Sequence, residues 1–232
     1  MSNPKVVERM LVDGSRKLYI FFGGVLGGIA ILPFEFYKAS NILNENKIFV
    51  RDVEQCWYHK GLLGISHDLQ TTALFLKSEI DRLNVEEVYF VGNSMGGYAA
   101  ILFSTLVGRG EVIAFAPQTF ISPELRQKYS DARWSRQMLK THDVPTEKAF
   151  DLRTLLLSSE LIPRISIFVS RDDVLDCIHA NHIRNIPNLD IYYFSGGGHA
   201  IIKQLKEEGK LADILSGNYL KNNRPSDVPT RT

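Results

Sequence analysis

One short stretch, residues 88–100, constrains the fold more than any other part of the chain. It begins with a β-branched and aromatic segment, passes through Gly92-x-Ser94-x-Gly96, and continues into small and then apolar residues. The first part is typical of a buried strand, and the last part is typical of a helix that lies on a sheet. Ser94 is therefore predicted at a sharp strand-to-helix turn. Such a turn crowds the positions two before and two after the serine, which explains why both are glycine.

The composition gives this pattern its context. Glycine and serine are common enough that Gly-x-Ser-x-Gly also arises by chance, so its placement between a strand and a helix is what makes it informative. The 232 residues are 44% apolar, which favours one globular domain with a large core. The 27 Lys and Arg residues against 26 Asp and Glu leave a net charge of +1, so no basic surplus points to nucleic acid or to an anionic membrane.

Two further features bear on the compartment. Cys56 and Cys177 are too few for a disulfide framework, and the first residues lead into no signal-peptide core, so we expect a cytoplasmic protein. Residues 18–34 carry no charge, but this run is slightly short for a membrane span and contains Pro33 and several glycines. A buried strand that enters a glycine-rich turn explains the run better than a membrane helix does.

Strand and helix patterns alternate along the rest of the chain. Strands are predicted at residues 18–22, 47–50, 88–91, 112–116, 165–169 and 189–194, and helices at 65–83, after Ser94, at 179–183 and at 200–215. This alternation predicts an α/β fold with a mostly parallel central sheet and helices on both faces. The strand before Ser94 is expected near the centre of the sheet. Residues 6–12 read as an opening antiparallel strand, and Asp13-Gly14 is a hairpin signal.

The predicted domain organisation is simple. Residues 1–220 form a single domain, and residues 221–232 form a loose polar tail with two prolines. Residues 118–161 depart from the strand–helix rhythm. They read either as a small helical cap over the site or as ordinary connecting helices.

The strand, the Gly-x-Ser-x-Gly turn and the helix together resemble the nucleophile elbow of the α/β-hydrolase family, and the resemblance covers residues 18–215. It implies an α/β-hydrolase fold and a catalytic triad in the chain order serine, acid, histidine. Ser94 is then the nucleophile. His199 fits the base, because it follows the last predicted strand and a triple-glycine loop, much as the family's Gly-x-Gly-His sequence does.

Three carboxylates compete for the position of the acid. Asp172, Asp173 and Asp176 all follow the strand at residues 165–169. The family's usual Gly-x-x-Asp pattern selects Asp173, although Ser170 stands in the place of the glycine. Asp176 is the next choice and Asp172 the last. The two that are not the acid are expected to cap a helix or to lie exposed.

The resemblance also implies an oxyanion hole. One backbone N–H would come from Met95, and the other from Gly24 in the turn after the strand at residues 18–22, where Phe22 stands in the place of the family's histidine. The alternative is a plain glycine turn. Trp57, Tyr58 and His59 follow another strand end, where they would either line a substrate pocket or pack at the surface.

These features predict an enzyme without a metal or cofactor. No His, Cys and Glu cluster has metal-ligand spacing, and no dinucleotide-binding glycine motif follows a strand. The main hypothesis is a serine hydrolase that cleaves a small-molecule ester or thioester through an acyl-serine. An acyltransferase with the same triad is the first alternative, and a non-catalytic binding protein on this scaffold is the second. The substrate and the oligomeric state stay open.

Overall fold

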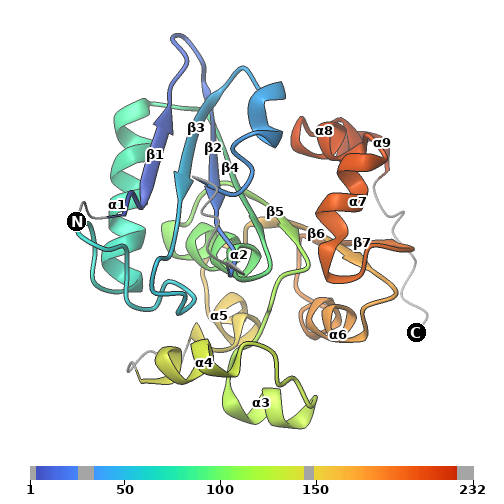
Figure 1. The fold of residues 1–232 in the computed structure, drawn as a ribbon. Helices are drawn as coiled ribbons and strands as arrows, with labels where there is room; N and C mark the ends of the chain where they lie inside the picture. Colours follow the sequence, from blue (N-terminus) through green and yellow to red (C-terminus); the bar gives the residue numbers. More distant parts are fainter. Residues whose placement is uncertain (1–3, 26–33, 144–148, 224–232) are drawn as a thin grey trace.

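A seven-stranded sheet forms the centre of the molecule in the computed structural model, which describes residues 4–25, 34–143 and 149–223 (Figure 1). The strand order is β1-β3-β2-β4-β5-β6-β7. All neighbouring strands pair in parallel except β1, which pairs antiparallel with β3. The strand that leads to Ser94 is β4, the fourth of the seven. The predicted fold class and the central place of this strand are therefore confirmed.

The elements follow one another in the order strand, helix, strand that the sequence predicts. The strands are β1 (Val7–Met10), β2 (Lys17–Phe22), β3 (Asn46–Val50), β4 (Glu87–Asn93), β5 (Glu111–Phe115), β6 (Arg164–Ser170) and β7 (Leu189–Phe194). The α-helices are α1 (Leu69–Leu83), α2 (Met95–Val107), α3 (Pro123–Lys128), α4 (Ser135–His142), α5 (Leu152–Leu157), α6 (Val174–His182), α7 (Ile201–Glu207), α8 (Lys210–Leu215) and α9 (Asn218–Asn222). Short 3-10 helices lie at η1 (Ala39–Ile42) and η3 (Gly198–Ala200).

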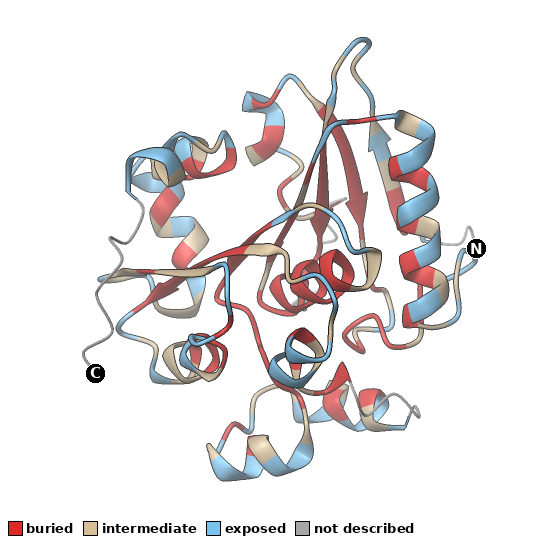
Figure 2. Cartoon of the chain, turned by 180° about the vertical axis from the view of Figure 1, so that it is seen from behind, coloured by how far each residue is buried: buried red, intermediate tan, exposed pale blue. Residues whose placement is uncertain are grey.

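Two apolar layers cover the two faces of the sheet. Alternate residues of each strand point to opposite faces, so Ile20 and Phe22 of β2 join one cluster while Tyr19 and Phe21 join the other. The first cluster contains residues of α1, α2, α4, α5 and α6. The second contains residues of α7 and α8, and η1 packs against it. Helix α2 and the central strands are almost entirely buried (Figure 2). The elements around Ser94 therefore lie in the most tightly enclosed part of the fold.

The N-terminal hairpin is one prediction that the structure overturns. Asp13 and Gly14 do form a turn, but β1 pairs with β3 rather than with β2. Pairing of β2 with both β3 and β4 leaves no free edge of β2 for β1. The opening strand is antiparallel, as expected, but it closes the outer edge of the sheet.

Helix boundaries also differ from the predicted ones. Helix α1 begins at Leu69 rather than at residue 65, because the Asp68 side chain caps it and accepts the N–H of Thr71. The helix predicted at residues 200–215 is divided into α7 and α8 at Gly209, whose φ is 73°. Residues 221 and 222 belong to α9 rather than to a loose tail, and residues 224–232 lie outside the described residues.

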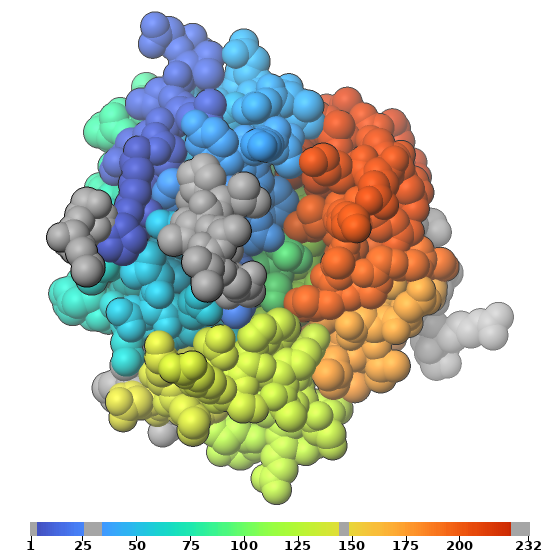
Figure 3. Space-filling view, viewed as in Figure 1, coloured from blue at the N-terminus to red at the C-terminus, as the bar shows by residue number. Residues whose placement is uncertain are grey.

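The insertion at residues 118–161 contributes α3, α4 and α5 to the described part of the chain. Helices α3 and α4 lie below the sheet in Figure 1. Met138 of α4 nevertheless belongs to the core, as do Leu152 and Leu156 of α5. In Figure 3 the insertion, coloured yellow-green, lies along the lower edge of the molecule, below and to the left of the orange-red C-terminal helices. Its interpretation as a cap stays a prediction. Within the described residues no helix has the length and apolar character to cross a membrane, and residues 18–22 of the uncharged run form β2.

The two glycines around Ser94 are required by close backbone packing. A Cβ at Gly92 would lie 2.0 Å from the carbonyl oxygen of Gly96, and a Cβ at Gly96 would lie 2.2 Å from that of Phe22. These atoms belong to backbone, which cannot move aside. The turn after β4 is therefore possible only because both positions lack a side chain.

We expect Gly96→Ala to lower the free energy of unfolding by about 2 kcal/mol or more, because the new methyl group forces β2 and α2 apart. Gly97→Ala is the matched control in the same helix. Its Cβ would lie 3.0 Å from the Cβ and 3.1 Å from the Cα of Pro117, and 3.3 Å from the carbonyl oxygen of Gly92. These contacts are tight but far longer than the 2.2 Å at Gly96, so they need only small shifts, and alanine favours the helix. Urea denaturation of both variants measures the difference. Equal stabilities would show that the close approach at Gly96 does not limit the fold.

Candidate active site

Ser94 occupies the turn between β4 and α2 in a backbone conformation that is unusual for serine, with φ 55° and ψ −120°. Its N–H donates to the carbonyl of Phe115 at 2.9 Å, and its carbonyl accepts the N–H of Tyr98 at 3.0 Å. Flanking hydrogen bonds thus hold a conformation that costs free energy. The side chain lies at the carboxyl end of the central strand, at the edge where open α/β sheets bind ligands.

His199 lies in η3, directly after β7, and its side chain contacts Ser94. It follows Gly196, Gly197 and Gly198, whose φ angles are 85°, 80° and 51°. Three successive left-handed residues turn the chain back sharply after β7, which only glycine does without strain. The Nε2 atom of His199 lies 3.0 Å from the Oγ of Ser94, across 105 residues of sequence. This geometry suits an imidazole that accepts the hydroxyl proton.

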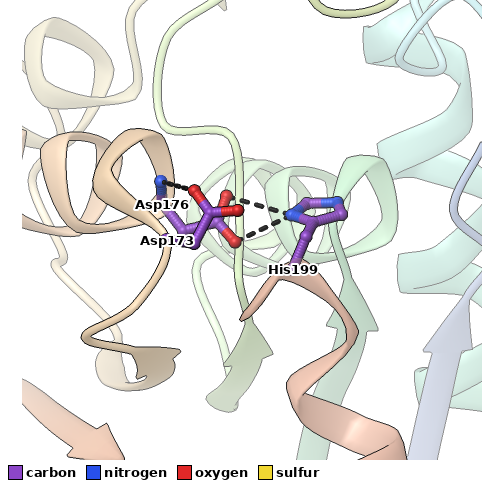
Figure 4. Close-up of side chains that lie close together, drawn as sticks. All are labelled: Asp173, Asp176 and His199. Carbon is purple, nitrogen blue, oxygen red and sulfur yellow. Dashed lines mark hydrogen bonds and ion pairs between the residues drawn. The ribbon is translucent and has the colours of Figure 1, made fainter. Parts of the chain in front are cut away.

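The carboxylate against His199 belongs to Asp176. Its Oδ2 lies 2.8 Å and its Oδ1 3.0 Å from Nδ1 of His199 (Figure 4). The Asp176 side chain is fully buried, whereas the His199 side chain is 31% exposed. The structure therefore differs from the sequence prediction, which placed Asp173 here.

The reason is that α6 begins earlier than predicted. Asp173 is the N-cap of α6, and its carboxylate accepts the N–H of Asp176 at 2.9 Å. This makes Asp176 a residue of the first helical turn, and the turn carries its side chain toward His199. Asp172 has a third role, because its Oδ2 accepts the N–H of Gly196 at 2.7 Å and so ties down the glycine loop. Each of the three candidate carboxylates has a distinct partner.

The two predicted oxyanion donors lie at the elbow in different states. The N–H of Met95 is the first of α2, and it has no acceptor among the described residues. Gly24 also lies at Ser94, since a Cβ built on it would be 3.8 Å from the Cβ of Ser94. Its N–H, however, donates to the Oε2 of Glu35 at 2.7 Å. A carboxylate thus takes up the amide that the sequence assigns to the oxyanion.

Glu35 is a half-buried acid that sequence reasoning missed. Its other oxygen accepts the side-chain N–H of Asn93 at 3.0 Å. Burial raises the pKa of Glu35, while the hydrogen bonds from Gly24 and Asn93 and the nearby His199 lower it only in part. Glu35 also lines a cavity of about 270 Å³ between residues 34–39 and α7 and α8. Nothing in its sequence context, between two phenylalanines, indicates a place beside the serine.

Trp57, Tyr58 and His59 are buried in the core rather than in an open pocket. The Tyr58 hydroxyl donates to the carbonyl of Gly23 at 3.0 Å, so it supports the glycine turn from behind. His59 Nε2 lies 2.9 Å from the hydroxyl of Tyr98, which itself donates to the carbonyl of Ala149. Burial lowers the pKa of His59 to about 3. A role for these three side chains in holding the site together fits their positions better than substrate binding does.

Gln118 is a second functional candidate that the sequence did not single out. It is fully buried after β5, and its Nε2 donates to the Oγ of Ser94 at 3.0 Å. The serine oxygen can therefore accept from Gln118 while its own proton points to His199. The available signal was position alone, since Gln118 follows a strand at the ligand-binding edge.

Two of the candidate acids and His199 lie close enough together to be considered as metal ligands. Ligand atoms of Asp173, Asp176 and His199 all lie within 4.8 Å of one another. Asp173 is occupied by the helix N-terminus, however, and Asp176 and His199 bond to each other. Their arrangement is that of a hydrogen-bonded pair beside a helix cap.

Comparisons with known proteins agree with this architecture. No family model matches the sequence, and no curated protein matches it. Among solved structures, the capsule O-acetyltransferase of Neisseria meningitidis serogroup A is similar with a TM-score of 0.67 and 17% identity, over 92% of this chain and 93% of that one. An esterase of Thermogutta terrifontis gives 0.60 and 15%, over 94% and 89%. MenH of S. aureus gives 0.56 and 13%, over 94% and 99%.

These similarities extend over nearly the whole of each chain. They show that the protein has the α/β-hydrolase fold, the scaffold of the esterases and of the acetyltransferase just described.

Glu35→Gln should make stability less dependent on pH. The folded protein holds the Glu35 proton more tightly than the unfolded chain does, so the unfolding free energy falls as pH rises from about 4.3, the usual value for glutamate, toward the raised pKa. Glutamine has no such proton to lose. The variant should therefore gain stability relative to the parent between about pH 4.5 and pH 8.

Urea denaturation at both pH values measures this gain. Glu160→Gln is the control, because Glu160 is exposed. A stability difference between Glu35→Gln and the parent that stays constant across this range would contradict a raised pKa.

Proposed function

We propose that the protein is a serine-dependent acyl-transfer enzyme, in which Ser94 is the nucleophile, His199 the general base and Asp176 the acid. The observation that carries the proposal is the continuous hydrogen-bonded line from Asp176 through His199 to the Oγ of Ser94. A serine hydroxyl is a weak nucleophile unless such a base takes its proton. The buried carboxylate fixes the imidazole tautomer and stabilises its charged form.

The reaction proceeds in two halves. His199 takes the proton of Ser94 as the oxygen attacks the acyl carbon of an ester or thioester, and the tetrahedral oxyanion accepts the free N–H of Met95. His199 then passes the proton to the leaving alcohol or thiol, which leaves an acyl-Ser94. In the second half His199 activates water or another alcohol, which attacks the acyl group and regenerates the serine.

Gly24 takes part in this scheme only if Glu35 releases its N–H. An ionised Glu35 would place a negative charge beside the oxyanion, which disfavours the transition state. The raised pKa of Glu35 favours the neutral acid and weakens this repulsion. Gly24 is therefore the second donor in our proposal, and Glu35 is the group that occupies it between turnovers.

Two acceptors of the acyl group are compatible with this site. Hydrolysis is the first candidate, and the esterase of Thermogutta terrifontis shares the fold. Transfer to an alcohol is the second, since the capsule O-acetyltransferase shares the fold over a similar share of its chain. A small-molecule ester or thioester is the expected donor in both cases, and a cytoplasmic location stays a prediction.

The proposed nucleophile can be tested with a fluorophosphonate probe, which reacts only with an activated serine. The wild-type protein should be labelled and Ser94→Ala should not, because the variant lacks the attacking oxygen. Turnover of para-nitrophenyl acetate should fall by about three orders of magnitude or more in the same variant. Ser104→Ala, in the same helix, is the control and should keep both signals. Labelling of a folded Ser94→Ala protein would refute the assignment.

The proposed acid can be tested by exchanging each carboxylate for its amide. Asp176→Asn should lower kcat by about 10³-fold or more, because the amide neither balances the charge on His199 nor favours its correct tautomer. Asp173→Asn should be mild, since asparagine caps a helix as well as aspartate does. Turnover of both variants decides the assignment, after each has been checked for folding by circular dichroism. A severe Asp173→Asn and a mild Asp176→Asn would restore the sequence prediction.

A further inference from the structure

A buried ion-pair network in the insertion ends on the proposed catalytic acid. Arg133 lies just before α4, and its Nη1 donates to Oδ1 of Asp176 at 2.8 Å. Its Nε and Nη2 donate to the two oxygens of Asp131, each at 3.0 Å. The side chains of Asp131 and Asp176 are fully buried, and that of Arg133 is 20% exposed. One guanidinium therefore bridges two buried carboxylates.

The network continues from Asp131 through His179 of α6 to Thr119, in the segment that follows β5. His179, one turn after Asp176 on α6, has its Nε2 3.0 Å from Oδ2 of Asp131. The Nδ1 atom of His179 accepts the N–H of Thr119 at 3.1 Å, and Thr119 is the neighbour of Gln118. Because Gln118 bonds to Ser94, the contacts form a closed ring that runs from Ser94 through the insertion to Asp176 and His199, and back to Ser94.

The charges in this ring favour one protonation pattern. Burial opposes the charge of Asp131, but hydrogen bonds from His179 and Arg133 outweigh it and hold the pKa of Asp131 below its usual range. Burial lowers the pKa of His179, so this imidazole stays neutral. The ring then holds two carboxylates and the Arg133 guanidinium, and a second guanidinium, that of Arg126, lies 3.8 Å from Oδ2 of Asp131. A buried carboxylate such as Asp176 needs a partner of this kind, since a lone buried charge is strongly disfavoured.

We propose that Arg133 is a positioning residue of the acyl-transfer reaction, which holds the Asp176 carboxylate against Nδ1 of His199 and links the insertion to catalysis. The inference rests on the function proposed above. Asp131 binds the Nε and Nη2 atoms of the guanidinium, and this fixed orientation directs Nη1 at Asp176. Trp134 contacts both groups. Its ring centre lies 5.3 Å from that of His199, and the Arg133 guanidinium lies over the same ring at 5.2 Å from its centre.

A purely structural role of Arg133 would have a different experimental outcome from the proposed positioning role. Arg126 donates to the carbonyl of Arg133 at 2.6 Å, so the same network also fastens the turn between α3 and α4. If Arg133 served only to hold the turn between α3 and α4, its loss would lower the free energy of unfolding without a specific effect on Asp176. The two roles separate when Asp176 itself is changed, because an effect that acts through Asp176 disappears with it.

The test is a double-mutant cycle on turnover of para-nitrophenyl acetate. Arg133→Gln should lower kcat about ten-fold or more with little change in KM, whereas in the Asp176→Asn background it should cost less than about two-fold. Arg133→Lys keeps the charge but not the fork, and should fall between the parent and Arg133→Gln. Arg136→Gln removes an exposed arginine of α4 and is the matched control. Equal losses in both backgrounds would overturn the proposal, and so would a full loss in a folded Arg133→Lys.

A second readout is independent of turnover. The Nδ1 proton of an imidazole that is hydrogen-bonded to a buried carboxylate gives a downfield ¹H NMR signal, which His199→Ala identifies by its absence. Arg133→Gln should shift or abolish this signal, and Arg136→Gln should leave it unchanged. An unchanged signal in Arg133→Gln would overturn the inference even in an active enzyme. Absence of Ser94-dependent turnover would instead refute the proposed function and leave this measurement to decide on Arg133.

Discussion

The arrangement of the whole site depends on the close approach of two backbones at the turn between β4 and α2. Gly96 lies against the carbonyl of Phe22, and Gly92 lies against that of Gly96, with no space for a Cβ at either position. This contact brings the end of β2 to the start of α2. It therefore places the Gly23–Gly24 turn, Ser94 and the first N–H of α2 within one small volume, before any side chain of the site is considered.

Electrostatics sets the second level of organisation. The protein buries the carboxylates of Asp131 and Asp176 and supplies Arg133 between them. Glu35 is treated differently, because it receives only neutral donors from Gly24 and Asn93 and has a raised pKa. The site therefore contains one acid whose charge is compensated and one whose charge is disfavoured. This contrast fits the proposed reaction, which needs a negative charge beside the imidazole of His199 and none beside the oxyanion.

The sequence predicted those features that are encoded by short patterns. The fold class, the central strand and the glycine turn at Ser94 follow from local periodicity and from glycine positions. The choice between Asp173 and Asp176 did not, because it depends on where α6 begins, and helix starts are uncertain by a few residues from sequence alone. A better signal was present in Asp173 itself, since aspartate is among the preferred N-cap residues. Arg133, Asp131 and Glu35 could not be found this way, because their contacts join segments far apart in the chain.

The glycines before His199 determine when the proposed base reaches its position. Although glycine is often associated with mobility, Asp172 holds the N–H of Gly196, and Gln204 donates to the carbonyl of Ser195 at 2.6 Å. The loop is therefore a rigid connection, and it contains glycine because its backbone conformation requires it rather than because it must move. The Nε2 atom of His199 lies 3.0 Å from the Oγ of Ser94 at the end of this loop. The fold itself therefore positions the proposed base, so the entropic cost of placing it is met during folding rather than in each cycle of the proposed reaction.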